Sequence, residues 1–175
     1  MATNNSINTG KGTTGTVLIG NTGSDDTFSA TPSVTSIKFG AGTALSTYQE
    51  GTFTPTLFGA STAGATTYVT QTGLYTKIGR QVNFSLFVQW SAATGTGIIV
   101  VGALPFVANS SLTYFPVTIY TSILVTTATS LAAIMQGSAT SLIINGFIAS
   151  TGAVVTSSLA ANTSGTLYVN GSYIT

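Results

Sequence analysis

The side chains that perform acid–base or nucleophilic chemistry are nearly absent from this chain. It has no histidine and no cysteine, and its three carboxylates are Asp25, Asp26 and Glu50. Without histidine there is no Ser-His-Asp or Cys-His catalysis and no usual zinc site. Glycoside hydrolysis needs two carboxylates roughly 5–10 Å apart, whereas Asp25 and Asp26 are neighbours that point apart in a strand. We therefore expect no enzyme, no catalytic residue, no metal site and no cofactor.

Two short motifs have plain structural interpretations. Ser24–Thr27 is typical of a turn in which aspartate side chains bond to the nearby main chain. Gly10–Gly15 matches G-x-G-x-x-G, but no strand precedes it, no helix-forming stretch follows, and no acidic residue lies about 20 positions on. If copies of the chain shared a carboxylate site between them, the protein would be a polysaccharide depolymerase. We keep this as a functional alternative, ranked third.

Aromatic side chains supply the main recognition chemistry. Tyr114 and Tyr120 offer flat faces for stacking on a sugar ring, together with a hydroxyl group for hydrogen bonding. Trp90, Tyr168 and Tyr173 share this chemistry. The alternative is that these rings pack in the core or between subunits, where aromatic residues dominate the buried area. We take Tyr114 and Tyr120 as the candidate glycan-binding residues.

Charge is the outlying feature of the composition. Charged residues make up 4% of the chain and none follows Arg80, whereas ordinary soluble domains carry about 25%. With a net charge of only +1, a free monomer would be prone to self-association. There is no basic stripe for nucleic acid, and no apolar run reaches the ~18–20 residues that span a bilayer. We expect further copies of the chain as partners, without nucleic acid and without membrane insertion.

The chain divides into an extended N-terminal arm, residues 1–44, and a β domain, residues 45–175. The arm is rich in Gly, Thr, Asn and Ser and contains the short apolar pieces Val17–Ile19 and Ile37–Phe39. Such a segment docks on a partner rather than forming its own core. Its start has neither a basic region nor an apolar stretch, so it does not resemble a secretory signal.

Period-two alternation predicts strands throughout the second part. The clearest is Gln81–Trp90, in which apolar and polar residues alternate with Phe87 as the exception. Asn145-Gly146 interrupts an apolar run as a turn or a bulge, and Ser130–Gln136 alone has helix-forming composition. Many short strands without helices between them predict a β-sandwich or jelly-roll-like domain. The other expected strands are Thr66–Thr72, Gly97–Ala103, Tyr114–Val125, Ser141–Ala149, Ala153–Ser157 and Gly165–Ile174.

The sequence Leu-Ser-Thr-Tyr-Gln-Glu-Gly-Thr-Phe-Thr-Pro-Thr-Leu at residues 45–57 resembles the opening of a module found in bacteriophage tail fibres, tailspikes and small virion surface proteins. That module begins Leu-x-x-Tyr-x-Glu-Gly-Thr-(aromatic)-Thr-Pro-x-Leu. A Tyr-Thr-Lys-(Ile/Val)-Gly turn then leads into a long strand, here Tyr75–Gly79 and Gln81–Trp90. A Leu-Pro-Phe segment and an aromatic last strand follow in order, here Leu104–Phe106 and Thr166–Tyr173.

The resemblance implies a homotrimeric β-sandwich on the virion surface that attaches to a host cell surface and its glycans. Residues 1–44 would then join the chain to other virion proteins. The alternative is a purely structural role, as a capsid decoration or a filament subunit without a receptor.

The few charges of residues 45–175 suggest where copies meet. Glu50 is their only anion, and Lys77 and Arg80 are their only cations. An unpaired charge at a buried interface is costly, so we expect these three side chains to meet. The apolar anchors of this candidate interface are Tyr48, Phe53 and Trp90.

Overall fold

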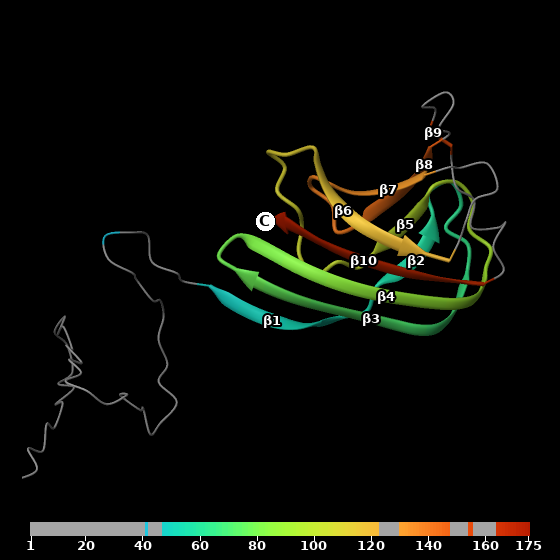
Figure 1. Ribbon diagram of the computed structural model, residues 1–175, viewed down its shortest axis with the longest axis horizontal. Coiled ribbons are helices and arrows are strands. Elements are labelled where there is room, and N and C mark those ends of the chain that lie inside the picture. The colour runs from blue at the N-terminus through green and yellow to red at the C-terminus, as the bar shows by residue number, and fades with distance from the viewer. Residues whose placement is uncertain (1–40, 42–46, 123–129, 148–153, 156–163) are drawn as a thin grey trace, which may run out of the picture. The chain divides into compact units, whose positions relative to one another are not determined.

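Figure 1 shows the computed structural model of the chain. It divides into two units, residues 1–35 and 36–175, of which the first lies outside the described residues. The predicted arm apart from Ala41, and with it the predicted turn at Ser24–Thr27, also lies outside them. The described residues are 41, 47–122, 130–147, 154–155 (main chain only) and 164–175.

The described part of the chain confirms the all-β class. Every strand pairing is antiparallel. No helix occurs among these residues, and so none there is long and apolar enough to cross a membrane. The strands are β1 (Tyr48–Phe53), β2 (Thr56–Gly59), β3 (Thr66–Ile78), β4 (Gln81–Ala93), β5 (Ile99–Gly102), β6 (Tyr114–Thr121), β7 (Ser130–Gln136), β8 (Leu142–Phe147), β9 (Val154–Val155) and β10 (Gly165–Ile174).

These strands form one antiparallel sheet that curls around its own core (Figure 1). Their order is β1-β3-β4-β10-β6-β7-β8-β5-β2, and β9 pairs with β8. The two edge strands, β1 and β2, are consecutive in the chain, so Thr54 and Pro55 carry it from one edge of the sheet to the other. Residues of β2 in turn approach β3 and β4.

Alternation sorts the side chains of the curled sheet into an apolar interior and a polar exterior. In β4 the inward positions from Val82 to Trp90 are at most 4% exposed, while Phe87 lies on the outer face, as the sequence predicts. In β10, Leu167, Val169 and Tyr173 are buried in the same way. Removing these apolar surfaces from water is the main favourable term in folding.

The loop between β5 and β6 closes one end of this core through Phe106. The Tyr173 hydroxyl donates to the main-chain oxygen of Phe106 at 3.1 Å and accepts from its N–H at 3.2 Å. The Phe106 ring meets the ring of Tyr75 edge-on, with centroids 5.2 Å apart. The Lys77 ammonium lies 4.8 Å from the same ring centroid, within cation–π range.

Side chains of β3 complete the curl where the main-chain ladder ends. The Tyr68 hydroxyl accepts from the N–H of Leu57 at 2.7 Å and lies 3.2 Å from its carbonyl oxygen, to which it donates. Thr66 donates to the same oxygen at 2.9 Å, and the Gln71 amide donates to the oxygen of Pro55 at 2.8 Å. We call these contacts the seam. They supply hydrogen-bond partners to main-chain groups at the edge of β2, so no further strand is needed there.

One local expectation needs correction, and one open alternative is decided. Asn145-Gly146 pairs continuously with Leu131 and Ala132 inside β8, so it is neither a turn nor a bulge. The segment with helix-forming composition, Ser130–Gln136, is strand β7, because pairing with β6 and β8 overrides a weak helical preference. By contrast, Gly79 has φ of 58° in the loop between β3 and β4, a conformation that favours glycine in short hairpins.

We predict that Tyr68→Phe destabilises the fold through the seam. The change keeps the ring but leaves the N–H of Leu57 without its hydroxyl partner, which costs about 1–3 kcal/mol of unfolding free energy. Urea denaturation measures the loss. Tyr120→Phe is the matched control, because its side chain is 70% exposed. Equal stability of the two variants would contradict the seam.

We also predict that stability falls in alkali through Tyr173. Burial raises the pKa of this hydroxyl from 10.0 to about 12, against a smaller opposing effect of the Phe106 main-chain hydrogen bond. The neutral form is therefore favoured in the folded state. Its contribution is complete below pH 10 and is lost as pH rises through 12. Urea titrations should show a loss of about 1.4 kcal/mol at about pH 11, and Tyr173→Phe should abolish that part of the pH dependence.

Candidate functional site

The outer face of β3, β4, β10 and β6 carries a row of aromatic side chains. Strand register places Thr72 opposite Phe87, Phe87 opposite Tyr168, and Tyr168 opposite Tyr120. Period-two alternation directs these side chains to the face away from the core. We call Phe87, Tyr168 and Tyr120 the aromatic row.

The rings of the aromatic row contact one another across the strands. Phe87 and Tyr168 stack with centroids 4.4 Å apart and planes at 21°, and Tyr168 and Tyr120 lie 6.0 Å apart at 51°. Tyr168 is nevertheless 43% exposed and Tyr120 is 70% exposed. Cross-strand aromatic pairs stabilise a sheet. Their exposure also leaves ring faces and hydroxyl groups available to a ligand.

Uncharged polar side chains flank the aromatic row on both sides. On one side Ser85, Asn170 and Thr118 lie opposite one another, and Ser85 donates to the Asn170 amide oxygen. On the other side Thr166 donates to the Ser122 hydroxyl at 2.9 Å. These neighbours are hydroxyls and amides, which donate and accept without favouring either sign of charge.

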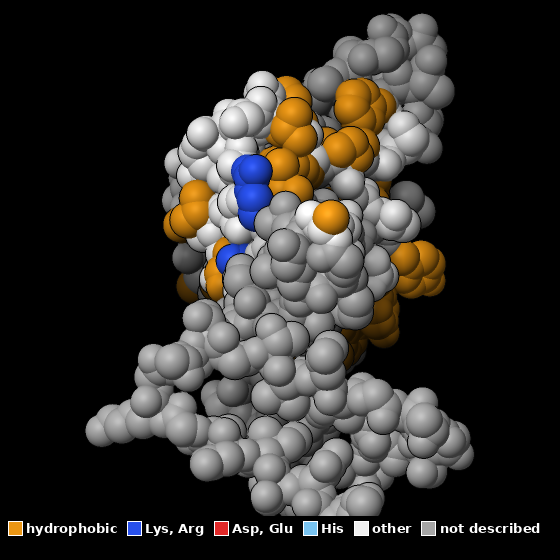
Figure 2. Space-filling model, turned by 90° about the vertical axis from the view of Figure 1, so that its left-hand side faces the viewer, with side chains coloured by type: hydrophobic (Ala, Val, Ile, Leu, Met, Phe, Trp, Pro, Cys, Tyr) orange, Lys and Arg blue, Asp and Glu red, His pale blue; other side chains and the backbone are white. Residues whose placement is uncertain are grey.

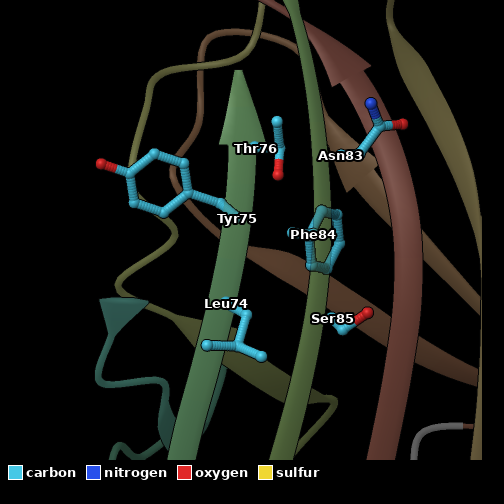
Figure 3. Close-up of a pocket in the computed structure, with 6 residues that line it drawn as sticks. All are labelled: Leu74, Tyr75, Thr76, Asn83, Phe84 and Ser85. Atoms are coloured by element: carbon cyan, nitrogen blue, oxygen red, sulfur yellow. The ribbon is translucent and has the colours of Figure 1, made fainter. Parts of the chain in front are cut away.

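Two shallow depressions border Leu74 on this outer face. One, of about 200 Å³, lies between β3 and β4, where Thr76, Asn83 and Ser85 project beside Leu74 (Figure 3). The other, of about 330 Å³, lies between β1 and β3 and includes Glu50. Leu74 itself is 55% exposed. The face therefore combines small hollows with exposed apolar groups rather than forming a deep cleft.

The predicted interface residues Tyr48 and Glu50 lie on edge strand β1 and are exposed. The Tyr48 hydroxyl donates to Glu50 Oε2 at 2.7 Å. This hydrogen bond to the Glu50 carboxylate, together with its negative charge, raises the pKa of Tyr48. Phe53, at the end of β1, is only partly buried and packs against the core.

Glu50, Lys77 and Arg80 each have another partner within the described fold, and their expected meeting between copies stays a prediction. Glu50 lies opposite Thr76, and Lys77 is the next residue, so its side chain points to the other face of the sheet. Lys77 instead covers the ring of Phe106. Arg80 Nε donates to the main-chain oxygen of Thr175 at 3.0 Å. In Figure 2, lysine and arginine side chains lie beside exposed hydrophobic ones.

Trp90 belongs to the core, not to an exposed interface. It is 1% exposed, and its indole N–H has no hydrogen-bond partner among the described residues. Tyr173 is buried as well. The core alternative considered for the aromatic residues therefore holds at these two positions.

The remaining predicted residues, Tyr114 and Tyr120, share the exposed face of β6. Their exposed fractions are 54% and 70%, and they lie six positions apart along the strand, at a distance of about 20 Å. Tyr120 joins the aromatic row, whereas Tyr114 lines a separate depression. Sequence reasoning missed Phe87, although it is the one apolar residue on the otherwise polar face of Gln81–Trp90.

Within the described ranges no group of three or more His, Cys, Asp or Glu residues could hold a metal ion. A comparison of the chain with protein-family models, with curated proteins and with solved structures found no match.

Proposed function

We propose that this chain is a non-enzymatic protein of a bacteriophage virion surface, in a tail fibre, short fibre or capsid decoration, and that it attaches the particle to uncharged glycans of a host cell. The exposed aromatic row carries the proposal. The resemblance of residues 45–175 to tail-fibre and tailspike modules supplies its biological setting.

The chemistry of the outer face favours a neutral, hydroxyl-rich ligand. Sugar rings combine an apolar face, which stacks on Tyr168 or Tyr120, with hydroxyl groups, which hydrogen-bond to side chains such as Asn170. The polar groups nearest the row are uncharged, so an ionic ligand finds no counter-charge there. Glu50 lies away from the row, on the edge strand of the sheet.

The proposal includes a homotrimer in which the curled sheet serves as a β-sandwich and residues 1–44 bind other virion proteins. Scarce charge favours the association of copies. The β1 edge is the proposed contact region, because Tyr48 and Ile78 lie opposite each other there and are 63% and 44% exposed. This arrangement leaves β4, β10 and β6 free for a ligand.

A structural subunit without a receptor is the second candidate. The observation that favours it is edge strand β1, which pairs with β3 alone among the described strands. An open edge offers main-chain donors and acceptors to a strand of another molecule.

We predict that the intact protein binds one or more uncharged oligosaccharides on a glycan array. Tyr120→Ala and Tyr168→Ala should each weaken binding of the selected glycan about tenfold, which corresponds to about 1.4 kcal/mol of lost stacking. Calorimetric titration measures the change. Val107→Ala is the control, since it trims an exposed apolar side chain in the loop between β5 and β6, outside the aromatic row and the proposed contact region.

An unchanged affinity in both variants of the aromatic row would contradict the proposal. Failure of the wild-type protein to bind any glycan would favour the structural candidate. Release of new reducing ends from capsule or lipopolysaccharide would instead support a depolymerase.

We further predict a stable trimer at micromolar concentration. Light scattering should give three times the chain mass of 17.7 kDa. Introducing charge at the proposed contact by Ile78→Lys should shift the protein towards monomers, because a buried unpaired charge is costly. The same change at exposed Val107 serves as the control. A wild-type monomer would rule out this assembly.

A further inference from the structure

A second candidate binding site lies where β6 begins and β7 ends. Tyr114, the first residue of β6, is opposite Gln136, the last residue of β7. The loops beside them enclose a depression of about 340 Å³ that Ser110, Leu112 and Ser138 help to line. This volume falls at the lower end of the range for small-molecule pockets.

Hydrogen bonds hold the two loops of this depression together. The N–H of Gly137 donates to the oxygen of Thr113 at 3.0 Å, and the N–H of Ser138 donates to the oxygen of Ala108 at 2.9 Å. Asn109 accepts from the N–H of Ser111 at 2.8 Å in a local side-chain turn. The walls are thus tied to each other across the chain, and the shape exists before any ligand arrives.

The main chain takes an unusual course at the floor of the depression. A Cβ atom on Gly137 would lie 2.2 Å from the oxygen of Leu112, so only glycine fits this approach. Ser138 has φ of 63°, in the left-handed region that is unfavourable for residues other than glycine. Such conformations concentrate at functional positions.

The side chains of the depression match a small uncharged ligand that has one apolar face and several hydroxyl groups. Tyr114 and Leu112 are 54% and 48% exposed and supply apolar contact. Ser110, Gln136 and Ser138 contribute hydroxyl and amide groups, and no charged residue is present in the lining. Hydroxyls and amides donate and accept alike, as the hydroxyl groups of a sugar require.

We propose that this depression binds one uncharged sugar ring, stacked on Tyr114 and hydrogen-bonded by Gln136. The site is distinct from the aromatic row, because about 20 Å of strand separates Tyr114 from Tyr120. A single ring occupies only one of them, whereas an oligosaccharide of several rings spans both. The inference rests on the proposed attachment function for its biological purpose, and it names a second subsite for that ligand class.

Amide-detected NMR of the intact protein tests the site. The probes are the methyl glycosides of glucose, galactose, mannose and N-acetylglucosamine, followed by neutral oligosaccharides of the same sugars. At least one methyl glycoside should shift amide signals in residues 108–114 and 136–138. Tyr114→Ala should weaken that binding at least tenfold and Gln136→Ala several-fold, while Tyr114→Phe should retain it. Val69→Ala, which trims an exposed side chain of β3 outside both proposed sites, should leave this binding unchanged.

The outcomes separate this site from the proposed function. Oligosaccharide shifts confined to the aromatic row, with none in residues 108–114 or 136–138, would overturn the Tyr114 site and leave the attachment function intact. Shifts around Tyr114 that Tyr114→Ala abolishes would support the site even if the row were silent. The absence of shifts with every probe would overturn the site. Thermal melting of each variant confirms that it is folded.

Discussion

The fold depends on how the sheet closes at the Leu57 edge. A ladder that ended at β2 would leave the N–H and C=O of Leu57 unpaired beside the core, and unpaired polar groups in such places are costly. The hydroxyl of Tyr68 satisfies both groups. Register shifts on either side of Tyr68, with Val69 left without a partner on β4, form the irregularity that positions it. A side chain thereby replaces the strand that would otherwise be needed.

Closure fixes which face of each strand meets water and therefore what the exterior can recognise. Once the interior belongs to residues such as Trp90 and Leu142, alternation places every second residue outside. On β4 and β10 most of these outward residues are polar. Phe87, Tyr168 and Tyr120 are outward aromatic residues at mutually opposite positions, so they form one row. Exposed aromatic side chains scattered singly over a surface need no explanation. Three aligned aromatic rings, however, form a surface with its own chemistry.

The sequence alone predicts what depends on local pattern. The strand class and the faces of β4 and β10 follow from alternation, whereas the turn at Gly79 is expected from the resemblance. Strands β1 and β2 escape prediction because they are short and lie at the edges of the sheet. Within one chain, Glu50 and Lys77 lie on opposite faces of the sheet, because a shift of one residue moves a side chain to the other face. The aromatic row depends on the register between β4, β10 and β6. Residues that are far apart in the sequence determine this register.

A surface almost without charge limits how tightly one site can hold a ligand. Neutral hydrogen bonds replace bonds to water and contribute only about 0.5–1.5 kcal/mol each, and exposed rings such as Tyr114 and Tyr120 stack with one face in solvent. Useful attachment through such contacts requires several to act at once. The two proposed subsites on β6 and the three copies of the proposed trimer would raise the effective concentration of each contact once another has formed. In this way a neutral surface gains avidity while it avoids the nonspecific attraction that a charged one exerts on ions and nucleic acids.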